Sequence, residues 1–359
     1  MRNSLRTVAG ALWFDLPLFL RCMATRDGWR MMRNRADIVR RAAGGGVRCE
    51  WRYTRSLHLA NVFPVTGRWL LKRALRCAPV RFQDRPEHST PTGTHWNGSV
   101  GDGEPEVSFL IGHRGRERRP LLEQALRSIA AQRDVRFECV VVEQEHDSSP
   151  RDPLPDWVRA VSTPAPPDLP YCRAWAFNVA AAVARAPVLI FHDNDLVVPD
   201  GYAGEALRRI RQGFEVVDLK RFIFYLTPAA TEKLISRHRL AAQVEMALQN
   251  AGAGGSIALS RAAFDDLGGF DEDFVGWGGE DVEFWDRCLT RKVWAHATLP
   301  LLHLWHAAQP GKRATRGLGA LTADLTERRR ALSPETRIAE LRRRPRGRAD
   351  APPMGGIPQ

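Results

Sequence analysis

The stretch "YCRAWAFNVAAAVARAPVLIFHDNDLVVP", residues 171–199, decides the fold class. Its first half is alanine-rich and predicts a helix, and its second half is a short apolar run that ends in the acidic sequence HDND. A helix that leads directly into a buried strand is typical of α/β proteins, in which crossover helices join parallel strands. Ligands bind such a sheet at the carboxyl ends of its strands, so the acids fall where a site is expected.

The same alternation begins earlier in the chain. The runs VSFLI (107–111) and FECVVVEQ (137–144) predict buried strands, and RPLLEQALRSIAAQ (119–132) between them has apolar residues at helical spacing. We therefore predict an α/β domain over residues 107–310, with a mainly parallel, Rossmann-like sheet flanked by helices.

Composition limits the class of protein. The chain has 359 residues, and its hydrophobic content of 44% is ample for a buried core. Its six cysteines form no CxxC pair, which argues against a zinc ribbon or a disulfide framework. Reduced thiols in a cytoplasmic protein are the simplest interpretation.

The net charge of +12 is unevenly distributed. Residues 1–90 and 311–359 are strongly basic, whereas residues 91–310 contain more acidic than basic side chains. The basic flanks either meet an anionic surface or are solvated arginines. Neither an RNP-type nor a helix-turn-helix pattern accompanies them, so we do not expect a nucleic-acid partner.

We expect residues 1–82 to form a basic, partly helical N-terminal extension and residues 83–106 to form a linker. The apolar stretch 8–20 contains Asp15 and Pro17 and is shorter than the ~20 residues of a spanning helix. An element that lies on an anionic membrane surface fits it better, which indicates peripheral attachment. Residues 311–359 predict a basic, Pro/Arg-rich tail.

Two polar clusters follow predicted strands. In HRGRER, after the first strand, Arg114 and Arg116 suit phosphate, because a guanidinium fork matches phosphate oxygens. In HDND, Asp193 and Asp195 offer oxygen ligands to a divalent cation that bridges phosphates. A D-x-D sequence alone is also compatible with an ordinary polar turn.

A third cluster lies further along the chain. In GWGGEDVEFWDRC (276–288), Glu280 and Asp281 follow three glycines and Trp277, where they are either functional acids or acids that stabilise a helix start. Behind them LPLLHLWH (299–306) ends an apolar run with His303 and His306, which are either core residues or metal ligands.

These motifs, in this order, resemble the β-1,4-galactosyltransferase type of GT-A glycosyltransferase and, more distantly, the polypeptide N-acetylgalactosaminyltransferases. The resemblance covers residues 107–306 and is carried by the segments IGHRGRERRPLL, VVVEQ, CRAWAFNVA, FHDNDLVVP and GAGGSIALSRAAFDDLGGFDEDFVGWGGEDVEFWDR. It implies a GT-A fold and an inverting glycosyl transfer from a nucleotide-sugar.

The resemblance also implies roles for single residues. Arg114, Arg116 and Arg173 would contact the donor diphosphate, Gly254 and Gly255 would let the backbone approach the donor, and Trp277 would pack on a sugar. Asp195, with Asp193 nearby, would hold Mn²⁺ or Mg²⁺, and His303 would complete the metal site, with His306 as the alternative; Asp193 would also contact the donor. Glu280 would hold the acceptor hydroxyl, and Asp281 would be the general base.

We therefore expect a metal-dependent inverting transferase that moves a hexose or N-acetylhexosamine from a UDP-linked donor to a hydroxyl of a glycan or lipid-linked acceptor, as in polysaccharide biosynthesis. The alternative is a catalytically inactive protein that binds sugars or polyanions. Three departures leave the acceptor open: Val282 stands where the family has a third acid, Asn194 occupies the centre of the D-x-D motif, and residues 218–249 have no recognisable counterpart.

Overall fold

The computed structural model describes residue 71 and residues 103–145, 153–163, 165–166, 169–241, 243–249, 253–276, 278–294, 299–307 and 318–353. Nearly all of the expected N-terminal extension and linker lies outside these residues, as does Trp277. Within the described part of the chain, no helix is long and apolar enough to span a membrane.

A seven-stranded sheet forms the centre of the molecule, in the order β10-β6-β9-β4-β1-β2-β3. Its strands are β1 (Val107–His113), β2 (Phe137–Glu143), β3 (Val158–Ser162), β4 (Val188–His192), β6 (Val216–Val217), β9 (Ser256–Ser260) and β10 (Val293–Trp294). Six strands run in one direction, and β9 pairs antiparallel with both β4 and β6. The predicted α/β fold with a mainly parallel sheet is confirmed, and it is compatible with the GT-A arrangement.

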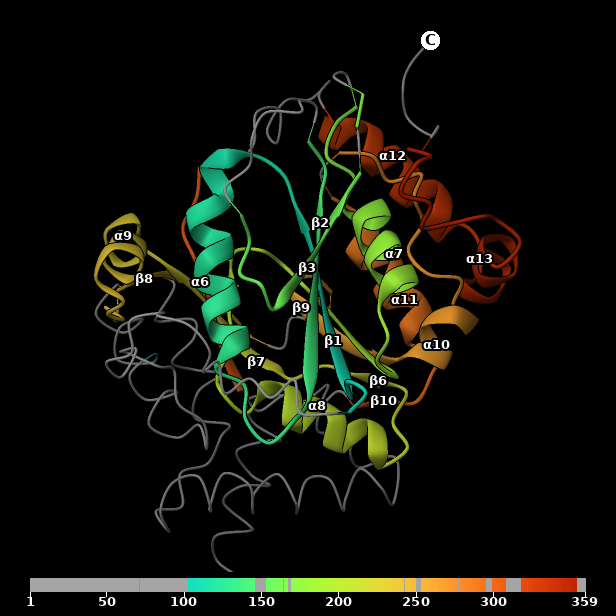
Figure 1. Cartoon of the computed structure of the whole chain (residues 1–359). Coiled ribbons are helices and arrows are strands. Elements are labelled where there is room, and N and C mark those ends of the chain that lie inside the picture. The colour runs from blue at the N-terminus through green and yellow to red at the C-terminus, as the bar shows by residue number, and fades with distance from the viewer. Residues whose placement is uncertain are drawn as a thin grey trace, which may run out of the picture.

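Helices cover both faces of this sheet, as Figure 1 shows with the sheet seen nearly edge-on. One face packs against α6 (Arg119–Ala130) and α8 (Tyr202–Arg211), and the other against α7 (Arg173–Val183), α10 (Arg261–Asp266) and α11 (Glu280–Cys288). Alternate residues of β1 serve the two cores: Phe109 enters the first and Leu110 the second. A strand buried on both faces needs apolar residues throughout, which explains the continuous run VSFLI.

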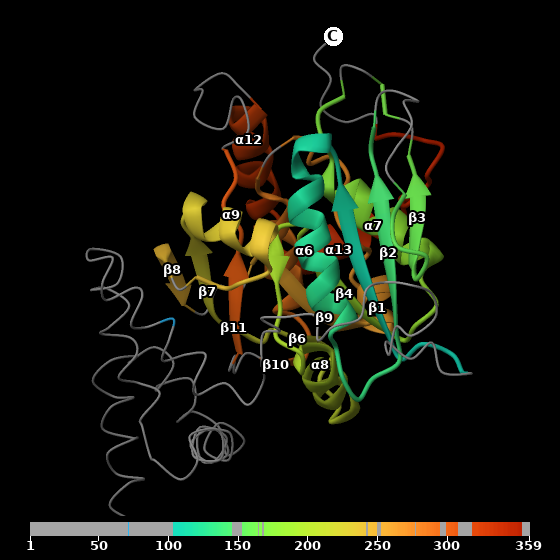
Figure 2. The ribbon, with the colours of Figure 1, turned by 60° about the vertical axis from the view of Figure 1, so that its left-hand side comes forward.

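A second, four-stranded sheet has the order β5-β11-β7-β8. Its strands are β5 (Leu196–Val197), β7 (Lys220–Leu226), β8 (Val244–Gln249) and β11 (Leu299–His303), and α9 (Pro228–Arg237) packs against it. The stretch 218–249, which the resemblance left unassigned, forms β7, α9 and β8. Figure 2 shows the two sheets side by side.

Part of the expected C-terminal tail is folded. Residues 318–353 include α12 (Leu318–Arg330) and α13 (Pro334–Leu341), and both helices pack against α11. Arg329 of α12 and Arg337 of α13 are buried, and carboxylates of the preceding loop and of α11 neutralise them; Arg337, for example, lies 3.0 Å from Glu283 Oε1. In Figure 1 these helices lie on the α7 side of the sheet.

Candidate active site

Asp195, His303 and His306 lie together at the carboxyl edge of the two sheets, and one ligand atom of each lies within 4.8 Å of the others. The acid lies in the turn after β4, directly before β5; His303 ends β11, and His306 follows three residues later. Antiparallel pairing of β5 with β11 brings them together, and the amide of Leu304 donates to the Asp195 carbonyl at 2.8 Å. Backbone hydrogen bonds between strands therefore build this triad.

The triad fits a divalent cation. Asp195 is buried, and no described residue donates a hydrogen bond to its Oδ1. His303 Nδ1 lies 2.8 Å from the Leu304 carbonyl, which favours a proton on Nδ1 and leaves Nε2, 3.7 Å from Asp195 Oδ1, as a ligand nitrogen. His306 Nε2 lies 3.2 Å from Asp195 Oδ2. A carboxylate and two imidazole nitrogens that converge in this way form a metal-ligand set.

The charge of Asp195 is stabilised by its neighbours. Burial alone raises the pKa of a carboxyl group, but His303, His306 and Arg118 outweigh it and hold the pKa of Asp195 well below its ordinary value. Asp195 is therefore ionised at neutral pH, as a metal ligand must be.

Asp193 has a different environment. Its Oδ1 accepts a hydrogen bond from Arg173 Nε at 2.7 Å, and it is not one of the three clustered ligands. Burial raises its pKa, although Arg173 opposes this shift. Between the two acids, Asn194 lies 3.0 Å from His113 Nδ1 and ties the turn to the end of β1. The middle residue of the motif thus positions the loop.

Arg173 connects the acidic turn to α11. It is the first residue of α7, and the Gln144 side chain fixes the helix start through hydrogen bonds to both backbone groups of Cys172. From there Arg173 contacts Asp193 and places its Nη1 3.2 Å from Glu280 Oε1. A single half-buried cation therefore joins two acids that are far apart in the sequence.

Glu280 is the first residue of α11 and is buried. Burial raises its pKa to about 7, with the Asp281 charge adding to the shift and Arg173 opposing it. Its Oε2 has no hydrogen-bond donor among the described residues. A buried carboxylate oxygen without a donor is costly, so it suits a hydroxyl supplied by a ligand.

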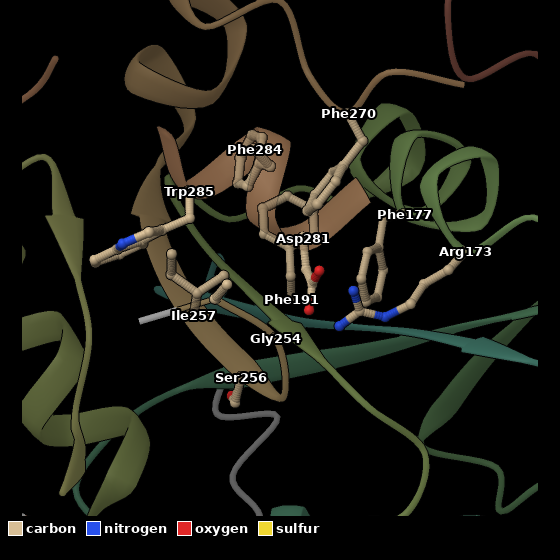
Figure 3. A pocket seen from close by; sticks show the side chains of 11 residues that line it. Arg173, Phe177, Phe191, Gly254, Ser256, Ile257, Phe270, Asp281, Phe284 and Trp285 are labelled. Carbon is tan, nitrogen blue, oxygen red and sulfur yellow. The ribbon is translucent and has the colours of Figure 1, made fainter. Parts of the chain in front are cut away.

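Asp281 faces Gly254 across a pocket. A Cβ atom on Gly254 would lie 2.6 Å from Asp281 Oδ2, so only glycine leaves room for the carboxylate, and Gly254 also has a φ of +76°. Figure 3 shows the Asp281 carboxylate and the Arg173 guanidinium pointing into this pocket. Asp281 Oδ1 accepts from the amide of Val282 at 2.8 Å, so it also bonds to the backbone at the helix start.

The other residues singled out in the sequence lie around this centre. Arg114 is half-buried and donates to the Leu169 carbonyl at 2.8 Å, and Arg116 is exposed in the 3-10 turn η1 (Arg116–Arg118). Gly255 packs against Leu196, Ile223 and Lys220 beneath the acidic turn. Trp277 lies outside the described residues.

Sequence reasoning missed three neighbours of the site. Arg118 donates to Asp195 at 3.1 Å, Tyr225 stacks on His303 with ring centroids 4.3 Å apart, and the buried Lys220 donates to the Ser256 carbonyl at 2.6 Å. Arg118 belongs to the quoted run HRGRER, but strand alternation does not indicate which arginine of a turn reaches the acids. Lys220 could have been suspected from the sequence, because a lysine at the start of an apolar strand is unusual, but this signal is weak.

One comparison with known proteins bears on this site. Residues 236–298 match a family model described as the N-terminal domain of galactosyltransferase. No curated protein matches the chain. The matched region contains Gly254, Gly255, Glu280 and Asp281, whereas the triad lies outside it. The match supports a galactosyltransferase-like glycosyltransferase and does not favour an inactive sugar-binding or polyanion-binding protein.

Proposed function

We propose that this protein is a metal-dependent inverting glycosyltransferase that transfers a hexose or N-acetylhexosamine from a UDP-linked donor to a hydroxyl group. One observation carries the proposal: the metal-ligand triad and the acid pair Glu280–Asp281 lie at one sheet edge, and Arg173 joins Glu280 to Asp193, two residues before the triad member Asp195. Such a transfer needs cationic groups at the leaving diphosphate and a carboxylate at the attacking hydroxyl.

The donor would bind over the triad. Asp195, His303 and His306 would hold the cation, and two imidazole ligands favour a transition metal such as Mn²⁺ over Mg²⁺. When bound, the cation supplies positive charge that stabilises the leaving diphosphate. Arg173, held between Asp193 and Glu280, adds a fixed positive charge close by, and Gly254 and Gly255 leave room for the sugar. Arg114 and Arg116 would contact the donor diphosphate.

The acceptor would bind at the start of α11. Glu280 Oε2, which is buried and has no donor among the described residues, would accept a hydrogen bond from an acceptor hydroxyl. Asp281 would take the proton of the attacking hydroxyl, since its carboxylate faces the pocket beside Gly254. Attack from that side, opposite the leaving diphosphate, inverts the configuration at the sugar carbon. Trp277 would pack on the acceptor sugar.

The basic flanks suggest where the acceptor is found. Residues 1–90 are rich in arginine, and near-surface basic residues attract anionic lipid by about 1 kcal/mol each. We therefore propose a cytoplasmic enzyme that binds the membrane peripherally and acts on a lipid-linked or polysaccharide acceptor.

A screen of nucleotide-sugars tests the proposal. The full-length protein is incubated with UDP-, GDP- and other nucleotide-linked sugars, and released nucleotide is measured with Mn²⁺, with Mg²⁺ and with EDTA. We expect release from a UDP-sugar with Mn²⁺ and almost none with EDTA. Equal nucleotide release with Mn²⁺ and with EDTA would contradict the metal requirement. If none of the nucleotide-sugars releases nucleotide, the proposal that the protein is an enzyme is contradicted.

A further inference from the structure

Arg118 contacts two of the three triad residues. Its Nη1 donates to Asp195 Oδ2 at 3.1 Å, and its Nη2 lies 3.1 Å from His306 Nδ1. The side chain is 15% exposed, so solvent screens the contact only partly. A guanidinium group stays protonated at all accessible pH values. A permanent positive charge therefore lies on the ligands that would hold the cation.

The backbone directs Arg118 to this place. Gly115, with a φ of +91°, turns the chain after β1, and its amide donates to Glu145 Oε1 at 2.9 Å. The amide of Arg118 then closes the turn on the Gly115 carbonyl at 3.1 Å, and α6 starts at the next residue. The anchored turn thus keeps the Arg118 guanidinium within reach of the triad, while the long, flexible side chain still lets the guanidinium change position.

Arg118 also affects which nitrogen of His306 can bind a metal. A hydrogen bond from Nη2 to Nδ1 requires the proton of neutral His306 to lie on Nε2, the atom that faces Asp195. In the other tautomer, Nδ1 donates to the Ala307 carbonyl at 2.8 Å and Nε2 is free to ligate. The Arg118 contact and a metal ligand bond therefore require opposite tautomers.

We propose that Arg118 couples cation binding to donor binding. Without nucleotide, Arg118 competes with the divalent cation for Asp195 and His306. When the donor binds, the Arg118 guanidinium moves from the Asp195 carboxylate to the diphosphate. The inference rests on the proposed function, since it assumes a cation at the triad and a diphosphate beside it. It predicts opposite effects of Arg118 on the two ligands, because the guanidinium repels one and attracts the other.

Mn²⁺ and UDP binding to the full-length protein test this coupling. Free Mn²⁺ is measured by electron paramagnetic resonance without nucleotide, and UDP binding by calorimetry at saturating Mn²⁺, for wild type, Arg118→Met and Arg118→Gln. We expect both variants to bind Mn²⁺ about tenfold more tightly and UDP about tenfold more weakly than wild type. Arg127→Met removes the same charge from the exposed side of α6 and should change neither value more than about twofold.

The possible outcomes separate this inference from the proposed function. Equal or weaker Mn²⁺ binding by both Arg118 variants, with wild-type Mn²⁺ binding intact, would overturn the competition and leave the transferase proposal standing. Unchanged UDP affinity would overturn the contact with the diphosphate. Absence of Mn²⁺ binding by wild type and variants alike would overturn this inference and the metal site together.

Discussion

The metal side and the acid side of the site are held in place by different means. Strand pairing places Asp195 next to His303 and His306, and each of these residues lies in a strand or within three residues of one. The acid pair Glu280–Asp281 instead starts a short helix after a glycine-rich loop, and it depends on contacts from the C-terminal helices. The sheets therefore hold the metal side in place, whereas the C-terminal helices, which lie outside the sheets, hold the acid side.

The contacts on the acid side are mainly ionic. Arg329 of α12 lies 2.6 Å from Asp271 Oδ2 and 2.9 Å from Asp273 Oδ2 in the loop before α11. Close packing adds to them: Gly279, with a φ of +90°, has no room for a Cβ atom because Thr326 Oγ1 would lie only 2.2 Å away. The comparison teaches that substitutions on the two sides should have separable effects, on metal binding and on the catalytic acids.

The largest effect should come from the metal side. Asp195→Asn removes the only carboxylate of the triad, and with it several kcal/mol of charge stabilisation, so nucleotide release should fall about 10³-fold at saturating Mn²⁺. Rates measured with the donor found in the screen check this. Activity within tenfold of wild type would place the cation elsewhere.

On the acid side, Arg329→Met should lower the free energy of unfolding by about 3 kcal/mol, because the buried Asp271 carboxylate loses the guanidinium that lies 2.6 Å away and keeps the more distant Arg344, at 3.6 Å. Urea unfolding measures this. Arg330→Met is the matched control: its side chain is 57% exposed, and its loss should cost less than about 1 kcal/mol.

The comparison also predicts what Arg329→Met leaves alone. Mn²⁺ affinity should stay within about twofold of wild type, since strand pairing holds the triad independently. A large loss of Mn²⁺ affinity in a folded Arg329→Met protein would show that the two sides are not separable.

The same difference explains what the sequence could predict. The continuous apolar runs gave the strands, and acids or histidines at their ends pointed to Asp193, Asp195, His303 and His306. Helix-start glycines and acids pointed to Glu280 and Asp281. Strand ends and helix starts are local features, so sequence patterns reveal them.

The remaining features depend on partners far apart in the sequence. Residues 318–353 have the composition of a solvated tail, and burial of Arg329 and Arg337 becomes favourable through distant carboxylates such as Asp271, Asp273 and Glu283. Likewise, the choice of Arg118 over Arg114 or Arg116 as the neighbour of Asp195 depends on the turn at Gly115. The residue patterns of segment 318–353 and of HRGRER do not predict these contacts.

A smaller effect is expected from each histidine. His303→Ala and His306→Ala should each raise the Mn²⁺ concentration needed for half-maximal activity about 10- to 100-fold, because each removes one nitrogen ligand. His238→Asn, at a left-handed position outside the triad that suits asparagine, is the control. If only one histidine variant shows the shift, the other histidine is not a ligand.

The smallest effect concerns Glu280 and pH. Its pKa of about 7 in the folded protein lies above the ordinary value of 4.5, so the folded state retains a proton that the unfolded chain releases. The resulting stability is fully present below pH 4.5 and is lost as the pH rises through 7. Between pH 5 and pH 8, metal-free wild type should therefore lose about 2 kcal/mol more unfolding free energy than Glu280→Gln. Equal losses of unfolding free energy in the two proteins, measured by urea unfolding, would show that the pKa of Glu280 is not raised.

Asp281→Asn tests the central claim most directly, because it keeps the shape of the side chain and removes its ability to take a proton. We predict that sugar transfer falls about 10²- to 10⁴-fold, while Mn²⁺ and UDP affinities and the circular dichroism spectrum stay those of wild type. Asp286→Asn, on the same helix, should transfer at nearly the wild-type rate. Near-normal transfer by a folded Asp281→Asn protein would contradict the account and leave Asp281 only its hydrogen bond at the start of α11.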